Sequence, residues 1–356
     1  MKQPTTLFFE DKPLFGMDIG HGKVRVMQLA PVKHRLHLIG YGETTFEPTA
    51  IKEGVIENPE VVAEAIQGLF RHHLVGDITT IRTAMSLPIA RAFTRSLEAP
   101  KLSDKELKEA VTNEAEQYIP AALEDLYIDY TRVGTDPEKT TAFIVAMPKT
   151  IVDSYLTLSR MLGLETVILQ TSSGAGAELF GRDPQSDVPS LLIDFGSNSA
   201  DITVYDRGPA VSGTVACGSE LITAAIAQEL GVTEKEATLI KAKYGLNLSK
   251  KQPQIEKALS PTLSLLVKEI KRTVRYYEEH MHDKRKISQV IIAGGGANMP
   301  GLAEYLTSNL RMAVRSFDPS TFIDFGHLQP FNLTERMSYV TAAGLATINP
   351  KEVFNA

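Results

Sequence analysis

The feature that most limits the folds open to this chain is a pattern of elements that occurs twice. Each copy begins with a hydrophobic strand ending in Asp-x-Gly, which is Asp18-Ile19-Gly20 in the first copy and Asp194-Phe195-Gly196 in the second. Asp and Gly favour a hairpin turn for their own reasons, but the recurrence in one context predicts two similar α/β lobes facing a cleft. Hydrophobic periodicity predicts the elements of each copy: strands at 14–19, 23–29 and 36–46 and a helix from Pro59, then strands at 191–195, 200–205 and 210–216 and a helix at 219–230.

Length and composition are those of a multidomain globular protein. The chain has 356 residues, which is longer than a typical single domain with one hydrophobic core. Its composition of 43% hydrophobic and 22% charged residues is typical of a packed globular protein. A net charge of −6 and a pI near 5.8 argue against a nucleic-acid surface, which needs an excess of Lys and Arg. The single cysteine, Cys217, excludes an intramolecular disulfide and fits a reducing compartment such as the cytoplasm.

Direct membrane insertion is not expected from the sequence. The start of the chain has only the short apolar run Leu7-Phe8-Phe9, too short for a signal peptide, and no stretch reaches the roughly 18 apolar residues of a spanning helix. Residues 348–356 contain Pro350 and no long apolar face, so no amphipathic anchor is expected there. Any membrane association is therefore expected to run through a partner.

Between the two copies, residues 87–169 read as a small inserted α+β module. Ser103 and Glu106 form a capping box that predicts a helix to about residue 119. The pattern then predicts two strands and a helix, at 127–133, 141–146 and 149–162.

After the second copy, the sequence predicts helices and a return to a sheet. Thr233 and Glu236 make another capping box, for a helix through Lys243. Ser260-Pro261 is predicted to start a long amphipathic helix. A buried strand at 289–293 then runs into a glycine turn and a helix at about 300–309.

Three turns carry the candidate chemistry: Asp18 to Lys23, Asp194 to Ile202 and Ile291 to Asn298. Together they resemble the phosphate-1, phosphate-2 and adenosine motifs of the actin, heat-shock chaperone and sugar-kinase superfamily. Glycines leave backbone N–H groups free to wrap phosphate oxygens, and two aspartates could hold hydrated Mg²⁺ between them. Three glycines after a buried strand leave room for an adenosine against the backbone.

The resemblance implies an actin-like (ribonuclease H-like) two-lobed fold that binds ATP and Mg²⁺, with Asp18 and Asp194 as the metal ligands. The cofactor-binding residues it implies are Asp18, Gly20, His21, Gly22, Lys23, Asp194, Gly196, Ser197, Asn198, Gly218, Lys241, Gly294, Gly295, Gly296 and Asn298.

Within the superfamily, the inserted module is similar to the 1C subdomain of the PilM and FtsA branch. Two further segments also look like that branch: 38–68, which contains the pattern at 54–63, and 218–245, which ends in Lys241-Ala242-Lys243-Tyr244-Gly245. The likeness implies four subdomains: 1A at 1–86, completed by 170–188 and 331–356; 1C at 87–169; 2A at 189–220 and 285–330; and 2B at 221–284.

Some positions depart from the superfamily pattern. His21 stands where Ser or Thr is common, and Thr238 stands where a Glu often touches the ribose. The segment 170–176, which would position the attacking water, has no acidic residue and offers only Gln170. Slow or absent ATP turnover is therefore expected.

The resemblance implies a cytoplasmic scaffold of the type IV pilus assembly platform, peripheral at the cytoplasmic face of the inner membrane. Its implied partner is the short N-terminal tail of the bitopic membrane protein PilN, bound in a groove between 1A and 1C, and self-association is a further possibility. A FtsA-like division protein is the nearest alternative, although the C-terminal anchor is missing. A sugar-kinase-like phosphotransferase is another, although no segment between 76 and 169 matches a sugar pocket with a catalytic Asp.

Overall fold

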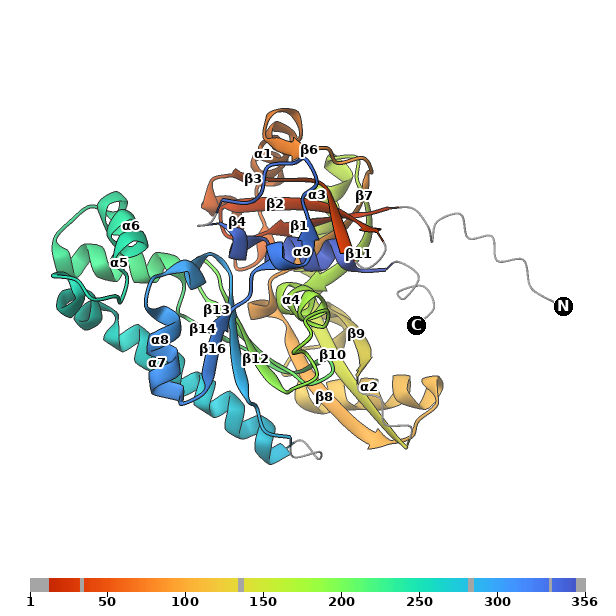
Figure 1. Cartoon of the computed structure of the whole chain (residues 1–356). Helices are drawn as coiled ribbons and strands as arrows, with labels where there is room; N and C mark the ends of the chain where they lie inside the picture. Colours follow the sequence, from red (N-terminus) through yellow and green to blue (C-terminus); the bar gives the residue numbers. More distant parts are fainter. Residues whose placement is uncertain (1–12, 33–34, 134–137, 281–284, 333–334, 350–356) are drawn as a thin grey trace.

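The computed structural model of the chain describes residues 13–32, 35–133, 138–280, 285–332 and 335–349. These residues form two lobes, each built around its own sheet, and a smaller sheet that lies beside both (Figure 1). The two-lobed α/β architecture predicted from the duplicated pattern is confirmed. Residues 350–356, on which part of the expectation about a C-terminal anchor rests, lie outside the described residues.

The first lobe contains a mixed sheet in the order β11-β7-β1-β2-β3-β17, with β6 pairing with β3. The first two strands of the predicted repeat form an antiparallel hairpin, and the first also pairs in parallel with β7. The strands are β1 (Phe15–Ile19), β2 (Lys23–Val32), β3 (Arg35–Thr45), β6 (Leu74–Gly76), β7 (Arg82–Leu87), β11 (Glu165–Thr171) and β17 (Ile323–Asp324).

Helices cover both faces of this sheet. Because successive strand residues point to opposite faces, Met17 packs toward α1 (Pro59–His72) and α3 (Lys149–Met161). Met27 packs on the other side, toward α4 (Ser172–Phe180) and α9 (Val340–Thr347). Burial on both faces explains why every residue of β7 is buried.

The second lobe repeats the arrangement with a sheet in the order β14-β13-β12-β15-β16. Its opening hairpin is again antiparallel, and the first strand again has a parallel neighbour on its other side. The sheet shares one core with four helices. The elements are β12 (Ser190–Phe195), β13 (Ala200–Tyr205), β14 (Pro209–Val215), β15 (Gln289–Ala293), β16 (Ala313–Ser316), α5 (Ser219–Leu230), α6 (Glu234–Lys243), α7 (Gln252–His280) and α8 (Leu302–Leu310).

The inserted module has an antiparallel sheet in the order β8-β10-β9, covered by α2 (Asp104–Tyr118). The strands are β8 (Phe93–Pro100), β9 (Leu126–Val133) and β10 (Lys139–Pro148). The sequence did not predict β8, because its residues show no clean alternation and most of them are only partly buried. This strand owes its conformation to pairing with β10 over its whole length. Both predicted capping boxes, Ser103 with Glu106 and Thr233 with Glu236, are confirmed.

The predicted start of the long helix is wrong. α7 begins at Gln252 and contains Pro261 in its interior, where a proline normally costs about 3 kcal/mol. Ile255 and Leu259, which precede the proline, are buried in the second-lobe core together with Leu263 beyond it. Burial of apolar side chains on both sides of Pro261 therefore outweighs the lost backbone hydrogen bond.

The helix α3, expected as part of the inserted module, belongs by its packing to the first lobe. Ile151, Tyr155 and Leu158 lie in the same core cluster as Phe15 and Met17. The division into four subdomains stays a prediction, but the last helix of 87–169 is part of the first-lobe core. Among the described residues, no helix combines the length and apolar character needed to cross a membrane.

Candidate functional site

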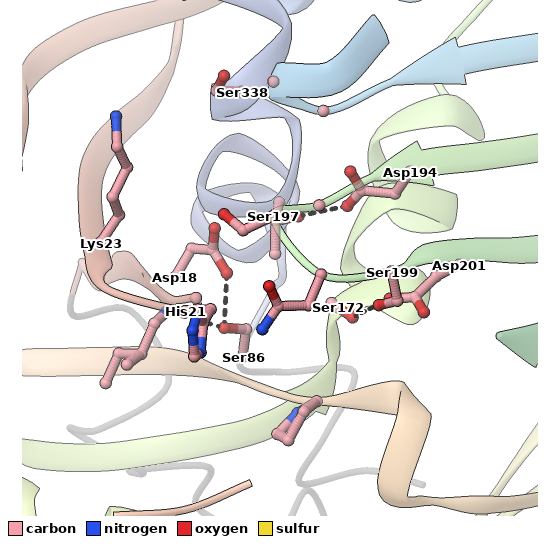
Figure 2. Close-up of a pocket in the computed structure, with 18 of the residues that line it drawn as sticks. Asp18, His21, Lys23, Ser86, Ser172, Asp194, Ser197, Ser199, Asp201 and Ser338 are labelled. Atoms are coloured by element: carbon pink, nitrogen blue, oxygen red, sulfur yellow. Dashed lines mark hydrogen bonds between the residues drawn. The ribbon is translucent and has the colours of Figure 1, made fainter. Parts of the chain in front are cut away.

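A cavity of about 520 Å³ lies between the two lobes and is lined by all three predicted turns. Figure 2 shows Asp18 from the first lobe reaching into the same pocket as Asp194 and Asp201 from the second. The predicted residues that line it are Asp18, Gly20, His21, Lys23, Asp194, Gly196, Ser197, Asn198, Gly294, Gly295 and Gly296.

The two phosphate-type turns share one backbone hydrogen bond. The amide of Gly20 donates to the carbonyl of Lys23 over 2.9 Å, and the amide of Gly196 donates to the carbonyl of Ser199 over 2.9 Å. Each turn is closed by one hydrogen bond at the same place in the repeat. The duplication seen in the sequence therefore extends to the hydrogen bond that closes each turn at the site.

In the first lobe, Asp18 is held at the end of β1 by a neighbouring strand. The hydroxyl of Ser86, on β7, donates to Asp18 Oδ1 over 2.7 Å and accepts from the amide of Ile19 over 3.1 Å. Arg25 Nη1 lies 3.9 Å from Asp18 Oδ2. Burial raises the pKa of the Asp18 carboxyl, against the opposing effects of Arg25 and Ser86.

In the second lobe, a second carboxylate stands beside the predicted one. Asp201 lies across the β12–β13 hairpin from Asp194, as Arg25 lies across β1–β2 from Asp18. Thr214 Oγ1 donates to Asp201 Oδ1 over 2.8 Å. Asp201 was missing from the predicted site residues. Its position in the second repeat is equivalent to that of Arg25 in the first, and this equivalence could have pointed to it.

The site holds more negative charge than its own cations neutralise. Burial, helped by the Asp201 and Asp18 carboxylates, raises the pKa of Asp194 to about 7, while Arg25 and Thr341 lower it. Burial raises the pKa of Asp201 to about 6. Buried carboxylates with raised pKa values favour a bound cation, because a cation restores the charged form that burial disfavours.

The third turn approaches the second so closely that two of its glycines are required. Gly294 has φ 82°, and a Cβ there would lie 2.2 Å from Asp194 Oδ1. A Cβ on Gly296 would lie 2.8 Å from the Cβ of Phe195. Gly295 differs, since its added Cβ would meet only the hydroxyl of Ser338, at 3.2 Å. Because Gly295 lines the cavity, a side chain there would enter it.

Four predicted residues, Gly22, Gly218, Lys241 and Asn298, are not among the residues that line the cavity. A Cβ on Gly218 would stand 2.1 Å from the carbonyl oxygen of Ser197, and one on Gly22 would stand 2.9 Å from Pro48 Cγ. Lys241 Nζ donates to Ser219 Oγ and Thr223 Oγ1, each over 2.7 Å, and burial lowers its pKa. Asn298 Nδ2 donates to the carbonyl of Gly295 over 3.3 Å.

Several residues that line the cavity came from segments without a motif. Ser86 on β7, Tyr155 on α3 and Thr341 on α9 reach it from strands and helices far apart in the chain. Their local sequence gave no signal, since only the packing of the first lobe brings these elements to the end of β1. Gln170, the residue considered for positioning water, does not line the cavity and lies at the end of β11.

A family model described as "Type IV pilus assembly protein PilM" matches residues 16–349 of the chain. The chain belongs to the PilM family. Among solved structures, it is similar to the "PilM-PilN type IV pilus biogenesis complex", with 22% identity, a TM-score of 0.79, and coverage of 94% of this chain and 98% of that chain. The predicted resemblance to PilM is confirmed.

The PilM-family chain is also similar to proteins outside type IV pilus assembly. The MreB 5 structure of Spiroplasma citri bound to AMPPNP is 11% identical, with a TM-score of 0.55 and coverage of 97% of this chain and 98% of that chain. The cell division protein FtsA of Neisseria meningitidis serogroup B is 23% identical over 376 residues, which cover 92% of this chain and 88% of FtsA. The actin-like fold is confirmed, and the family match favours pilus assembly over cell division.

Proposed function

We propose that this PilM-family chain binds ATP with Mg²⁺ between its lobes and serves as a docking scaffold in type IV pilus assembly. The observation that carries the proposal is the convergence of three glycine turns and an excess of buried carboxylate on one cavity. The remaining backbone N–H groups of the two turns would bind polyphosphate, and Lys23, whose Nζ lies 2.6 Å from Glu43 Oε1, lines the same wall. The third turn leaves space at Gly295 for the nucleoside.

The two carboxylates Asp18 and Asp194 fit Mg²⁺ better than a metal whose ligands all come from protein side chains. Within the described parts of the chain, no group of three or more His, Cys, Asp or Glu side chains is arranged to hold a metal ion. Mg²⁺ usually keeps several waters and takes one or two carboxylates together with phosphate oxygens. Asp18 and Asp194 would hold it, and the ion would supply the positive charge that these carboxylates and the phosphates share.

The test of the nucleotide site is calorimetry with Mg·ATP on the full chain. Asp194→Ala should weaken binding about 100-fold or more, since even outer-shell partners of a metal are worth about 10–100-fold. Gly295→Val should do the same by filling the cavity. Gly213→Val is the matched control, because a Cβ at Gly213, on β14 outside the cavity lining, meets nothing within 4 Å. Unchanged affinity in the first two variants would refute the proposal.

The proposed partner is the cytoplasmic N-terminal tail of a PilN-like bitopic membrane protein. β9 lies at the edge of the module sheet, with β10 as its partner strand, and an extended peptide can add to such an edge through main-chain hydrogen bonds. Tyr127 on β9 is 46% exposed, and its hydroxyl donates to Asp153 on α3 over 3.2 Å. The edge of β9 therefore borders the first lobe, which fits a tail held between the 1A and 1C subdomains.

Through such a tail the chain would be peripheral at the cytoplasmic face of the inner membrane. Negligible ATP turnover is part of the proposal, because the start of α4 carries no acidic residue that could position water. The chain would then use ATP to set its conformation for docking.

A further inference from the structure

The inserted module, although part of the first lobe along the chain, is bonded to the second lobe. The edge strand β8 of the module lies against the edge strand β14 of the second lobe, where the hydroxyl of Ser96 donates to the carbonyl of Ala210. The adjacent residue, Arg95, donates from Nη1 to the hydroxyl of Tyr276 on α7 over 3.4 Å. We call these two contacts the latch.

Both ends of the Arg95 contact are held in place by other groups. Arg95 Nε pairs with Glu114 Oε1 at 2.8 Å, and the guanidinium lies 3.8 Å from the centroid of the Tyr118 ring. The ring of Tyr276 stacks on His280 with centroids 4.3 Å apart. Because these neighbours already hold the side chains of Arg95 and Tyr276 in place, the two side chains lose less conformational entropy when they contact each other.

A third approach joins the far end of the module to the second lobe. A Cβ on Gly208, in the turn between β13 and β14, would lie 2.7 Å from Val133 Cγ1 at the end of β9. The module therefore meets the second lobe through both β8 and β9, and a rotation of one lobe relative to the other would shear this contact.

The module is also firmly attached to the first lobe. β10 runs at Pro148 directly into α3, whose Tyr155 is buried in the first-lobe core and lines the cavity. At its other end, the short helix η2 (Ile89–Arg91) leads from β7 into β8, and Arg91 lines the cavity. On the opposite side of the latch, β14 is followed by Ser219, which also lines the cavity.

We propose that the latch between the inserted module and the second lobe holds the two lobes at the angle needed for nucleotide binding. The present angle brings both phosphate-type turns to one cavity, which makes it the binding-competent angle. By linkage, a nucleotide that binds the two lobes at this angle stabilises the latch contacts. This inference rests on the proposed ATP binding.

The test removes only two hydroxyl groups that cross the interface, in the double variant Ser96→Ala/Tyr276→Phe. The matched control is Thr112→Val/Thr273→Val, which removes hydroxyls that bond within α2 and within α7. Hydrogen exchange of β8 and β14 is measured without nucleotide, and the Kd for Mg·AMP-PNP is measured by calorimetry.

In the latch variant, we expect faster hydrogen exchange in both strands and a Kd for Mg·AMP-PNP raised about fivefold or more, which is the lower end of typical coupling. The control variant should behave like the parent chain in both measurements. Unchanged exchange, or faster exchange with an equal or tighter Kd, would overturn the latch. If the parent chain itself binds no Mg·AMP-PNP, the proposed function fails and the coupling fails with it, whereas a failed latch leaves binding by the parent chain intact.

Discussion

Burial of the cavity carboxylates lowers the free energy of unfolding of the ligand-free protein at neutral and higher pH. Asp194 is the most affected, because burial and the neighbouring Asp201 and Asp18 raise its pKa to about 7. The unfolded chain ionises this group near its ordinary pKa of 3.8. Between these two values the folded state binds more protons than the unfolded state, so this group lowers the free energy of unfolding as the pH rises from about 4 to about 7.

Asp194→Asn is therefore expected to stabilise the ligand-free protein at pH 8, by about 2–4 kcal/mol. The gain should shrink as the pH falls and vanish near pH 4, where the folded and unfolded states of the parent chain are both protonated at this position. Urea unfolding at several pH values measures it, with Glu64→Gln, an exposed carboxylate on α1, as control. An Asn variant less stable than the parent chain at pH 8 would show that the carboxylate is not strained.

At the scale of elements, the floor of the cleft depends on the close approach of α9 to its neighbours. A Cβ on Gly16, in β1, would lie 2.2 Å from the carbonyl oxygen of Ala342. A Cβ on Gly344, in α9, would lie 1.9 Å from the carbonyl oxygen of Ala175 in α4. These two backbone contacts fix β1, and with it Asp18, against the helices that join the lobes.

Two helical glycines give a matched pair of substitutions. Gly344→Ala should lower the free energy of unfolding by about 3 kcal/mol, the upper end of overpacking, because its neighbour is backbone that cannot rotate away. Gly68→Ala in α1 should raise it by about 0.5–1 kcal/mol, since nothing lies within 4 Å of its added Cβ and Ala favours a helix. Thermal or urea unfolding measures both. Equal effects in the two variants would contradict the role given to the α4–α9 contact.

At the scale of the whole molecule, the inserted module cannot be removed as a block. The segment 87–169 includes most of β11, a strand of the first-lobe sheet, and α3, whose buried face belongs to the first-lobe core. Deleting it would unfold the lobe that carries Asp18. The docking surface is better tested by point substitution.

The proposed peptide docking predicts that a synthetic peptide copying the tail of the PilN-like protein from the same genome binds the full chain. Tyr127→Ala should weaken this binding by about tenfold or more, as expected for an exposed aromatic side chain that a bound peptide would cover. Leu239→Ala, which removes a 70% exposed side chain on α6 of the second lobe, should leave it unchanged. Fluorescence anisotropy with a labelled peptide measures both. Equal binding by the Tyr127 variant would move the docking site away from β9.

The sequence by itself determined the duplicated βββα pattern, the three turns and the capped helices. Each of these depends on residues close together in the chain, such as Asp194-Phe195-Gly196 or Ser103 with Glu106. Local backbone preferences and hydrophobic periodicity decide such features, so they can be read without a fold. The actin-like architecture followed from the order of these motifs.

Only the tertiary structure decided which groups surround the cavity and where the module is attached. Ser86 and Thr341 reach the site because β7 and α9 pack beside β1, and α7 continues through Pro261 because the core buries both of its halves. The strand β8 forms because it pairs with β10. Its latch contacts join residues that are far apart in the sequence: Ser96 and Ala210 are separated by 114 positions, and Arg95 and Tyr276 by 181. These features depend on contacts between distant segments, which no local pattern specifies.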